Sequence, residues 1–201
     1  MGRPRRHDAR TAERLLDAAE SILETEGLSA LTVRRVAEKS GTTTRAVYSV
    51  FGTKSGLVVA LAVRAFDLLY DGVTKVPETD DPVADVVLAG TSVFRALVTD
   101  HPALYRIAIQ RAVPEPDLVE GFRAAARRGL EALRSRFARL EADDQLGGRS
   151  VRDATTEFHA LCEGLGGLEL RGLLPAGSEE RIWREALFAL VHGFRARPRV
   201  S

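Results

Sequence analysis

The sequence predicts an all-α protein in which an N-terminal unit of three or four helices is followed by a larger helical bundle. Apolar residues recur at helical spacing along almost the whole chain. Outside residues 41–57, no stretch alternates polar and apolar residues well enough to predict a strand. Residues 72–81, GVTKVPETDD, have the composition of a linker and divide the helical pattern in two.

The N-terminal part is expected to contain four helices. The first begins near Thr11, whose hydroxyl can cap it, and stops at Gly27. Its apolar stripe consists of Ala12, Leu15, Leu16, Ala19, Ile22 and Leu23. A short second helix is predicted from Thr32 to Ser40, a third after the turn at Gly41-Thr42, and a fourth over about residues 55–71.

The C-terminal part continues the helical pattern. Further helices are predicted over residues 82–100, 101–112, 116–143, 150–173 and 178–196. The predicted domains are an N-terminal three-helix domain at residues 1–54, a connecting helix at about 55–71, and a C-terminal helical domain at 72–201.

Composition and charge narrow the class of protein. Of the 201 residues, 45% are hydrophobic and 28% charged, as in ordinary globular proteins. Residues 1–54 carry three more basic than acidic side chains although the whole chain is only +1, which points to an anionic partner at the N-terminal end. The single cysteine, Cys162, forms no internal disulfide. Without an apolar signal segment or a long apolar run, we expect a cytoplasmic protein.

The stretch GTTTRAVYSVFGTKSGL, residues 41–57, is ambiguous when read alone. Its β-branched and aromatic residues are typical of strands. In a helix, Val47, Val50 and Phe51 would share one apolar face, whereas a hairpin would place Ser49 among the buried residues. A short helix, a turn and a second short helix are the layout of a helix-turn-helix, so we predict a helix here.

The polar residues of this stretch then have distinct roles. Gly41 provides the positive φ of the tight turn, and Thr43 is the predicted N-cap of the second helix. The face turned away from the core carries Thr44, Arg45, Tyr48 and Ser49. Hydroxyls, a phenol and a guanidinium on one exposed face suit phosphates and base edges, so the sequence predicts a DNA-reading helix.

Ordered landmarks over about residues 10–60 resemble the tetracycline-repressor (TetR) family of bacterial regulators. They are LTVRRVAEKSG followed by VYSVFGTKSGL, after a first helix that ends at a glycine. The resemblance implies a sequence-specific DNA-binding regulator in which Thr32, Tyr48 and Lys54 contact phosphates. It places Arg34, Thr44, Arg45 and Ser49 where family members reach bases.

The chain departs from the family pattern at Thr42, Val50 and Ser55-Gly56. It contains no asparagine, and the helix-turn-helix has no glutamine, so adenine's usual bidentate partner is missing. We therefore predict that Arg34 or Arg45 contacts guanine O6 and N7.

The basic N-terminus is open to two interpretations. Arg3, Arg5 and Arg6 form either a flexible arm that enters the adjacent minor groove or a solvated terminus without a role in binding.

The C-terminal helices carry two further candidate sites. A dimer interface of the last two helices is implied by the family layout, the alternative being that both complete the core of one chain. The candidate interface residues are Leu161, Leu165, Leu168, Leu187, Leu190 and Phe194. An apolar effector pocket is compatible with a set of aromatic residues, each of which also suits an ordinary core. The set consists of Phe66, Phe94, Tyr105, Phe122, Phe158 and Trp183.

The arginines of the long helix are expected to form a solvated face rather than a second nucleic-acid surface. They are Arg123, Arg127, Arg128, Arg134, Arg136 and Arg139. No metal site or cofactor is predicted, because the histidines and Cys162 lack ligand spacing.

The functional interpretations fall into three classes. The chain lacks GxSxG, HExxH and phosphate-loop motifs, so no enzymatic activity is predicted. The resemblance implies a homodimeric repressor released from a palindromic operator by a small apolar effector. A regulator that binds DNA constitutively, or responds to a protein partner, remains open.

Overall fold

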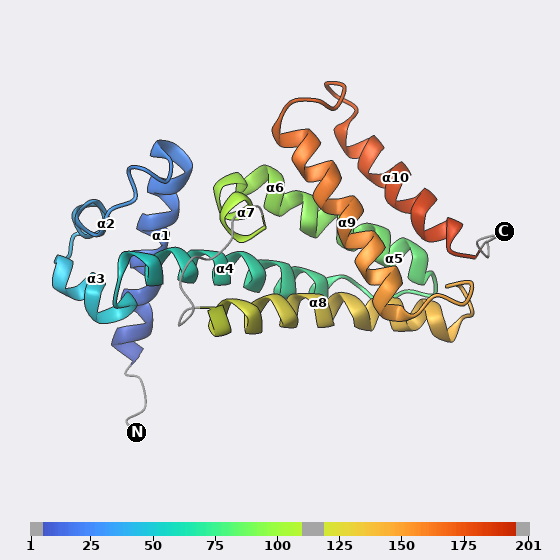
Figure 1. Ribbon diagram of the computed structural model, residues 1–201, viewed down its shortest axis with the longest axis horizontal. Coiled ribbons are helices and arrows are strands. Elements are labelled where there is room, and N and C mark those ends of the chain that lie inside the picture. Colours follow the sequence, from blue (N-terminus) through green and yellow to red (C-terminus); the bar gives the residue numbers. More distant parts are fainter. Residues whose placement is uncertain (1–5, 110–118, 196–201) are drawn as a thin grey trace. The chain divides into compact units, whose positions relative to one another are not determined.

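The computed structural model describes residues 6–109 and 119–195, and all regular structure within them is helical (Figure 1). The elements are α1 (Arg6–Glu26), α2 (Val33–Lys39), α3 (Thr44–Phe51), α4 (Lys54–Lys75), α5 (Pro82–Leu88), the π-helix η1 (Ala89–Phe94), α6 (Arg95–Asp100), α7 (Pro102–Ala108), α8 (Val119–Ala142), α9 (Val151–Leu170) and α10 (Glu179–Gly193). The predicted all-α class is confirmed.

The chain forms two compact units. The N-terminal unit comprises residues 1–65 and 101–125, and the C-terminal unit comprises residues 66–100 and 126–201. These units do not follow the boundaries predicted at residues 54 and 72. Helix α4 continues without interruption from one predicted domain into the next, and α7 packs against α1 within the N-terminal unit.

The N-terminal unit is built around α1. Ile22 of α1, Val36 of α2 and Leu57 of α4 are fully buried and supply its apolar core. The carboxylate of Glu20 joins two other elements to α1. It forms an ion pair with Arg64 Nε of α4 at 3.1 Å and lies 2.6 Å from His101 Nδ1, directly before α7.

In the C-terminal unit an aromatic core joins α8, α9 and η1. The rings of Phe137 and Phe158 meet edge to face with centroids 5.4 Å apart. At Gly90 of η1, a Cβ atom would lie 2.4 Å from Leu187 and 2.9 Å from Phe158, so a larger residue here would require these side chains to shift. The helix predicted over residues 82–100 is continuous but contains a π-helical segment at Ala89–Phe94.

The segment Pro82–Asp100 has the length and hydropathy of a membrane-crossing helix, with 19 residues and a mean hydropathy of 1.4. Within the protein 56% of it is buried. A core helix shows the same composition, because burial against protein and burial in lipid favour the same side chains.

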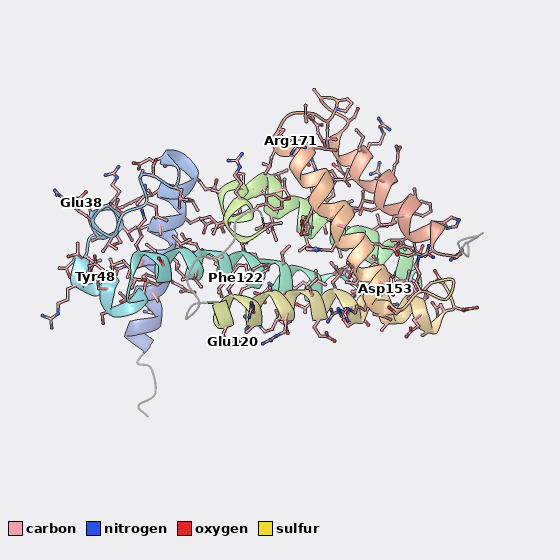
Figure 2. The ribbon with its side chains drawn as sticks, in the orientation of Figure 1. Glu38, Tyr48, Glu120, Phe122, Asp153 and Arg171 are labelled. Atoms are coloured by element: carbon pink, nitrogen blue, oxygen red, sulfur yellow. The ribbon has the colours of Figure 1, made fainter. Side chains whose placement is uncertain are left out.

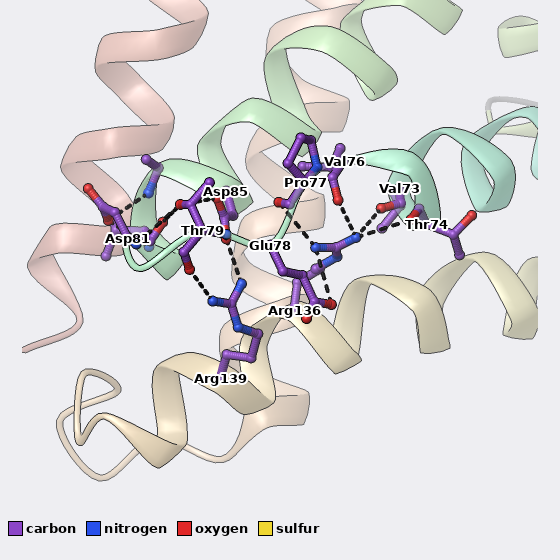
Figure 3. A network of polar contacts seen from close by, with 12 residues as sticks. Val73, Thr74, Val76, Pro77, Glu78, Thr79, Asp81, Asp85, Arg136 and Arg139 are labelled. Carbon is purple, nitrogen blue, oxygen red and sulfur yellow. Dashed lines mark hydrogen bonds and ion pairs between the residues drawn. The ribbon is translucent and has the colours of Figure 1, made fainter.

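The expectation of a solvated arginine face is wrong for two residues of α8. Arg136 is only 4% exposed, and Arg139 is about two-thirds buried. Both turn toward the end of α4 and the residues that follow it, where backbone carbonyls and the carboxylate of Asp85 accept their hydrogen bonds (Figure 3). Helical spacing alone could not reveal these acceptors, because they lie more than 50 residues away in the sequence.

Asp85 makes the stability of this region sensitive to acid. Burial raises the pKa of Asp85, but hydrogen bonds from Thr79 and Arg139 outweigh burial and hold this pKa below its ordinary value. A carboxylate whose pKa is depressed in the folded state stabilises the fold at pH values above the ordinary pKa of aspartate. This contribution disappears as the pH falls through the folded-state pKa.

We expect the free energy of unfolding of the wild type to fall more steeply than that of Asp85→Asn between about pH 5 and pH 2. Urea unfolding at a series of pH values measures this difference. Parallel pH profiles for the two proteins would contradict the assignment.

Candidate nucleic-acid interface

The turn between α2 and α3 is held by a cap on each helix. The Thr32 hydroxyl accepts from the backbone N–H of Arg35 at 3.2 Å, and the Thr43 hydroxyl accepts from that of Ala46 at 3.3 Å. Gly41 has φ +65°, the left-handed conformation that the turn requires. The structure confirms a helix rather than a strand in the ambiguous stretch.

Helix α3 is anchored by fewer apolar residues than the sequence suggested. Val47 is 1% exposed and Phe51 is half-buried, so these i and i+4 positions face the scaffold. Val50, predicted to share this face, is instead 37% exposed. In a helix of eight residues only a narrow stripe reaches the supporting helices, and Val50 lies at its edge.

The predicted reading residues lie on the exposed side of the helix-turn-helix. Tyr48 is 53% exposed and is labelled on α3 in Figure 2. The other exposed members of the set are Thr32, Arg34, Thr43, Thr44, Arg45, Ser49 and Lys54. Of these, Thr32 and Thr43 cap α2 and α3, Lys54 begins α4, and the rest present hydroxyls or guanidinium groups on the exposed side.

The basic residues of this surface differ in how they are held. Arg34 Nε donates to Glu38 at 2.9 Å, and Arg35 forms an ion pair with Glu26 at 3.1 Å. Arg45 and Lys54 have no hydrogen-bond or ion-pair partner within residues 6–109 and 119–195. Arg45 can therefore engage an anion or a base without first giving up a partner, whereas Arg34 must leave Glu38.

The cap at Thr43 gives a stability prediction. Thr43→Ala removes the acceptor of the Ala46 N–H, so we expect the free energy of unfolding to fall by about 1 kcal/mol. Thr42→Ala is the matched control, because the Thr42 hydroxyl makes no hydrogen bond within the described part of the chain. Chemical denaturation of both variants measures the difference, and equal losses would show that the Thr43 cap contributes nothing specific.

The aromatic residues predicted to line a pocket divide between the two units. Phe66, Phe94, Phe158 and Trp183 are buried in the C-terminal unit, where the rings of Phe94 and Trp183 lie 6.2 Å apart. Tyr105, which is 1% exposed, and the half-buried Phe122, which is labelled on α8 in Figure 2, belong to the N-terminal unit.

The residues predicted for a dimer interface also fall into two groups. Leu165, Leu187 and Phe194 are buried within the C-terminal unit of one chain. Leu161, Leu168 and Leu190 are half-buried. Phe188 of α10, which sequence reasoning missed, is 50% exposed and stacks on His192 with centroids 5.4 Å apart. Its place beside Leu187 in an apolar run was the available signal.

The structure describes only part of the predicted minor-groove arm. Arg3 and Arg5 of the proposed arm fall outside the described residues, and Arg6 is the first residue of α1. Within residues 6–109 and 119–195, no group of three or more His, Cys, Asp or Glu side chains could hold a metal ion.

A capped turn that presents a polar recognition helix on an all-α scaffold defines a helix-turn-helix DNA-binding protein. Residues 15–61 match the family described as bacterial regulatory proteins, tetR family. This match identifies the helix-turn-helix region as a TetR-family DNA-binding domain.

Known proteins support this placement. The HTH-type transcriptional regulator AlkX of Mycobacterium tuberculosis is 31% identical over 107 residues, covering 53% of this chain. The match spans only half the length of AlkX. The TetR-family regulator PfmR of Thermus thermophilus superimposes with a TM-score of 0.68 at 19% identity, over 89% of this chain and 97% of PfmR.

A further structural neighbour is the transcriptional regulator FadR of Bacillus subtilis in its complex with stearoyl-CoA. It has a TM-score of 0.74 at 16% identity, over 90% of this chain and 98% of FadR. At this identity the likeness establishes the fold.

Proposed function

We propose that the protein is a cytoplasmic homodimeric repressor that a small apolar effector releases from a palindromic operator. The observation that carries the DNA-binding part is the exposed face of α3, where Arg45 is free of any partner among the described residues. Tyr48 and Lys54 flank it with a phenol and an ammonium group suited to phosphates. No catalytic role is proposed.

Dimerisation is supported by exposed apolar surface on the last helix. Phe188 is half exposed in a single chain, and the half-buried leucines Leu161, Leu168 and Leu190 accompany it on α9 and α10. A second copy would remove this surface from water. Two identical recognition helices would then read two identical half-sites, which is why the operator is expected to be palindromic.

An apolar effector is supported by the fold shared with FadR, a protein solved with stearoyl-CoA. An effector releases DNA only if it binds one of two states of the repressor more tightly than the other. The alternative regulator, which lacks a small-molecule effector, is favoured by the tight packing of Phe94, Phe158 and Trp183, each at most 7% exposed.

The test begins with selection of the wild-type protein's binding sites from random-sequence DNA. Stearoyl-CoA and stearate are then titrated into the complex with the selected operator. Release by either probe supports the effector-controlled repressor, and retention with both favours the alternative. Failure to enrich any sequence would contradict sequence-specific binding itself.

A further inference from the structure

The C-terminal end of α4 is held by a buried arginine from another helix. The last four carbonyls of an α-helix lack partners within the helix. Arg136 Nη2 of α8 donates to the carbonyls of Val73 at 2.8 Å and Val76 at 2.7 Å, with Thr74 O at 3.4 Å (Figure 3). Arg136 Nη1 lies 3.4 Å from the Glu78 carboxylate. The guanidinium therefore caps α4 and places a positive charge where the helix dipole is negative.

A second contact, one turn further along α8, holds the residues that follow α4. Arg139 donates to Asp85 Oδ2 at 2.5 Å and to the carbonyl of Thr79. Asp85 also accepts from the Thr79 backbone N–H at 2.9 Å and from its hydroxyl at 2.7 Å. The stretch read from sequence as a linker is thus fixed to α8, and we call Arg136, Arg139, Asp85 and Thr79 the α4 clamp.

The chemistry of Arg136 suggests a geometric role. Arginine is almost never this deeply buried unless it is paired, and apolar residues of similar volume often fill such sites at no cost in stability. An apolar side chain in this place would leave the backbone carbonyls at the end of α4 without these directional hydrogen bonds. The two terminal nitrogens of the guanidinium, matched to several carbonyls, constrain where α4 ends and which way it points within the C-terminal unit.

The helix held by the clamp begins at the DNA-contact surface. Only Gly52 and Thr53 separate α3 from Lys54, the first residue of α4. The Thr53 hydroxyl caps this start by accepting from the Gly56 N–H at 2.9 Å. One continuous helix of 22 residues therefore carries Lys54 at one end and the carbonyls bound by Arg136 at the other.

We propose that Arg136 is a positioning residue for operator binding. Through the end of α4 it determines which separation of half-sites the dimer accepts. This inference rests on the proposed homodimeric DNA-binding function. Arg136 is remote in sequence from the helix-turn-helix, yet it would then influence how the two recognition helices are spaced on DNA.

The test compares operators with two arms and with one arm. The probe is the operator selected by the wild-type protein, together with a version whose second arm is scrambled and versions with altered spacing. Arg136→Met removes every donor while keeping an apolar stem, and Arg136→Lys restores a cation with fewer donors. Arg134→Met is the matched control, since Arg134 lies on the same helix, is 36% exposed and pairs with Glu131 at 3.2 Å.

We expect Arg136→Met to bind the two-armed operator about tenfold or more weakly, as part of the roughly 10²–10⁴-fold gain of two-site binding is lost. Its affinity for the one-armed operator should stay within about twofold of the wild type. The half-site spacing that Arg136→Met prefers should broaden or shift. In the ratio of two-armed to one-armed affinity, Arg136→Lys should be intermediate and Arg134→Met should match the wild type.

An unchanged ratio of two-armed to one-armed affinity would overturn the proposal. An equal loss of affinity on both DNAs gives that result, and it is what a merely structural role of Arg136 predicts. Circular dichroism establishes that each variant is folded at the assay temperature. If Arg136→Met does not fold, the same ratio measured on Arg136→Lys decides the question. Failure of the wild type to select any operator would instead count against the proposed function.

Discussion

Arg45→Ala is expected to remove most of the preference for one G·C pair in each half-site. A bidentate arginine contact with guanine contributes about 1–3 kcal/mol of discrimination, roughly 5- to 150-fold in affinity. Arg45 is the candidate because it is exposed and has no partner within the described residues, so it gives up no ion pair when it binds. Competition binding with operators substituted at each G·C pair measures the effect.

Two comparisons make this result specific. Arg34→Ala should cost less, because Arg34 must leave Glu38, to which it donates at 2.9 Å. Lys54→Ala should weaken binding almost equally for all sequences and lower the salt slope by about one. If Arg45→Ala and Arg34→Ala both leave base preference unchanged, the assignment of guanine contacts to these arginines is wrong.

Phe188→Asp is expected to produce a folded monomer that has lost about 10²–10⁴-fold in operator affinity. The ring is 50% exposed in one chain, so aspartate costs little there, but a carboxylate buried between two chains has no partner. Analytical ultracentrifugation gives the oligomeric state, and gel-shift titration gives the affinity.

Leu68→Asp is the matched control, since Leu68 is 38% exposed on α4 rather than on α10. It should remain dimeric. A dimeric Phe188→Asp protein that binds the operator normally would move the interface elsewhere.

Short-range rules account for most of what the sequence could predict. Helical spacing identified the helices, and the cap at Thr43 could be predicted because capping involves residues only three apart. In α3, packing of Val47 against its scaffold overrode the strand propensity of its β-branched residues.

Features that depend on distant neighbours could not be predicted. Arg136 has the spacing of a solvated residue, and only the end of α4, about 60 residues earlier, explains its burial. Leu187 was assigned to a dimer interface because it is apolar on a terminal helix, yet it is fully buried within one chain. Periodicity indicates which face of a helix is apolar, but it does not indicate what covers that face.

Guanine N7 methylation interference on the selected operator tests most directly whether α3 reads DNA in a symmetric dimer. The prediction is interference at one or more guanines in each arm, symmetric about the centre, with arms about one helical turn or a multiple apart. It further predicts that Arg45→Ala removes interference at the same guanine of both arms. Binding that tolerates methylation of every guanine, or interference in one arm only, would contradict the account.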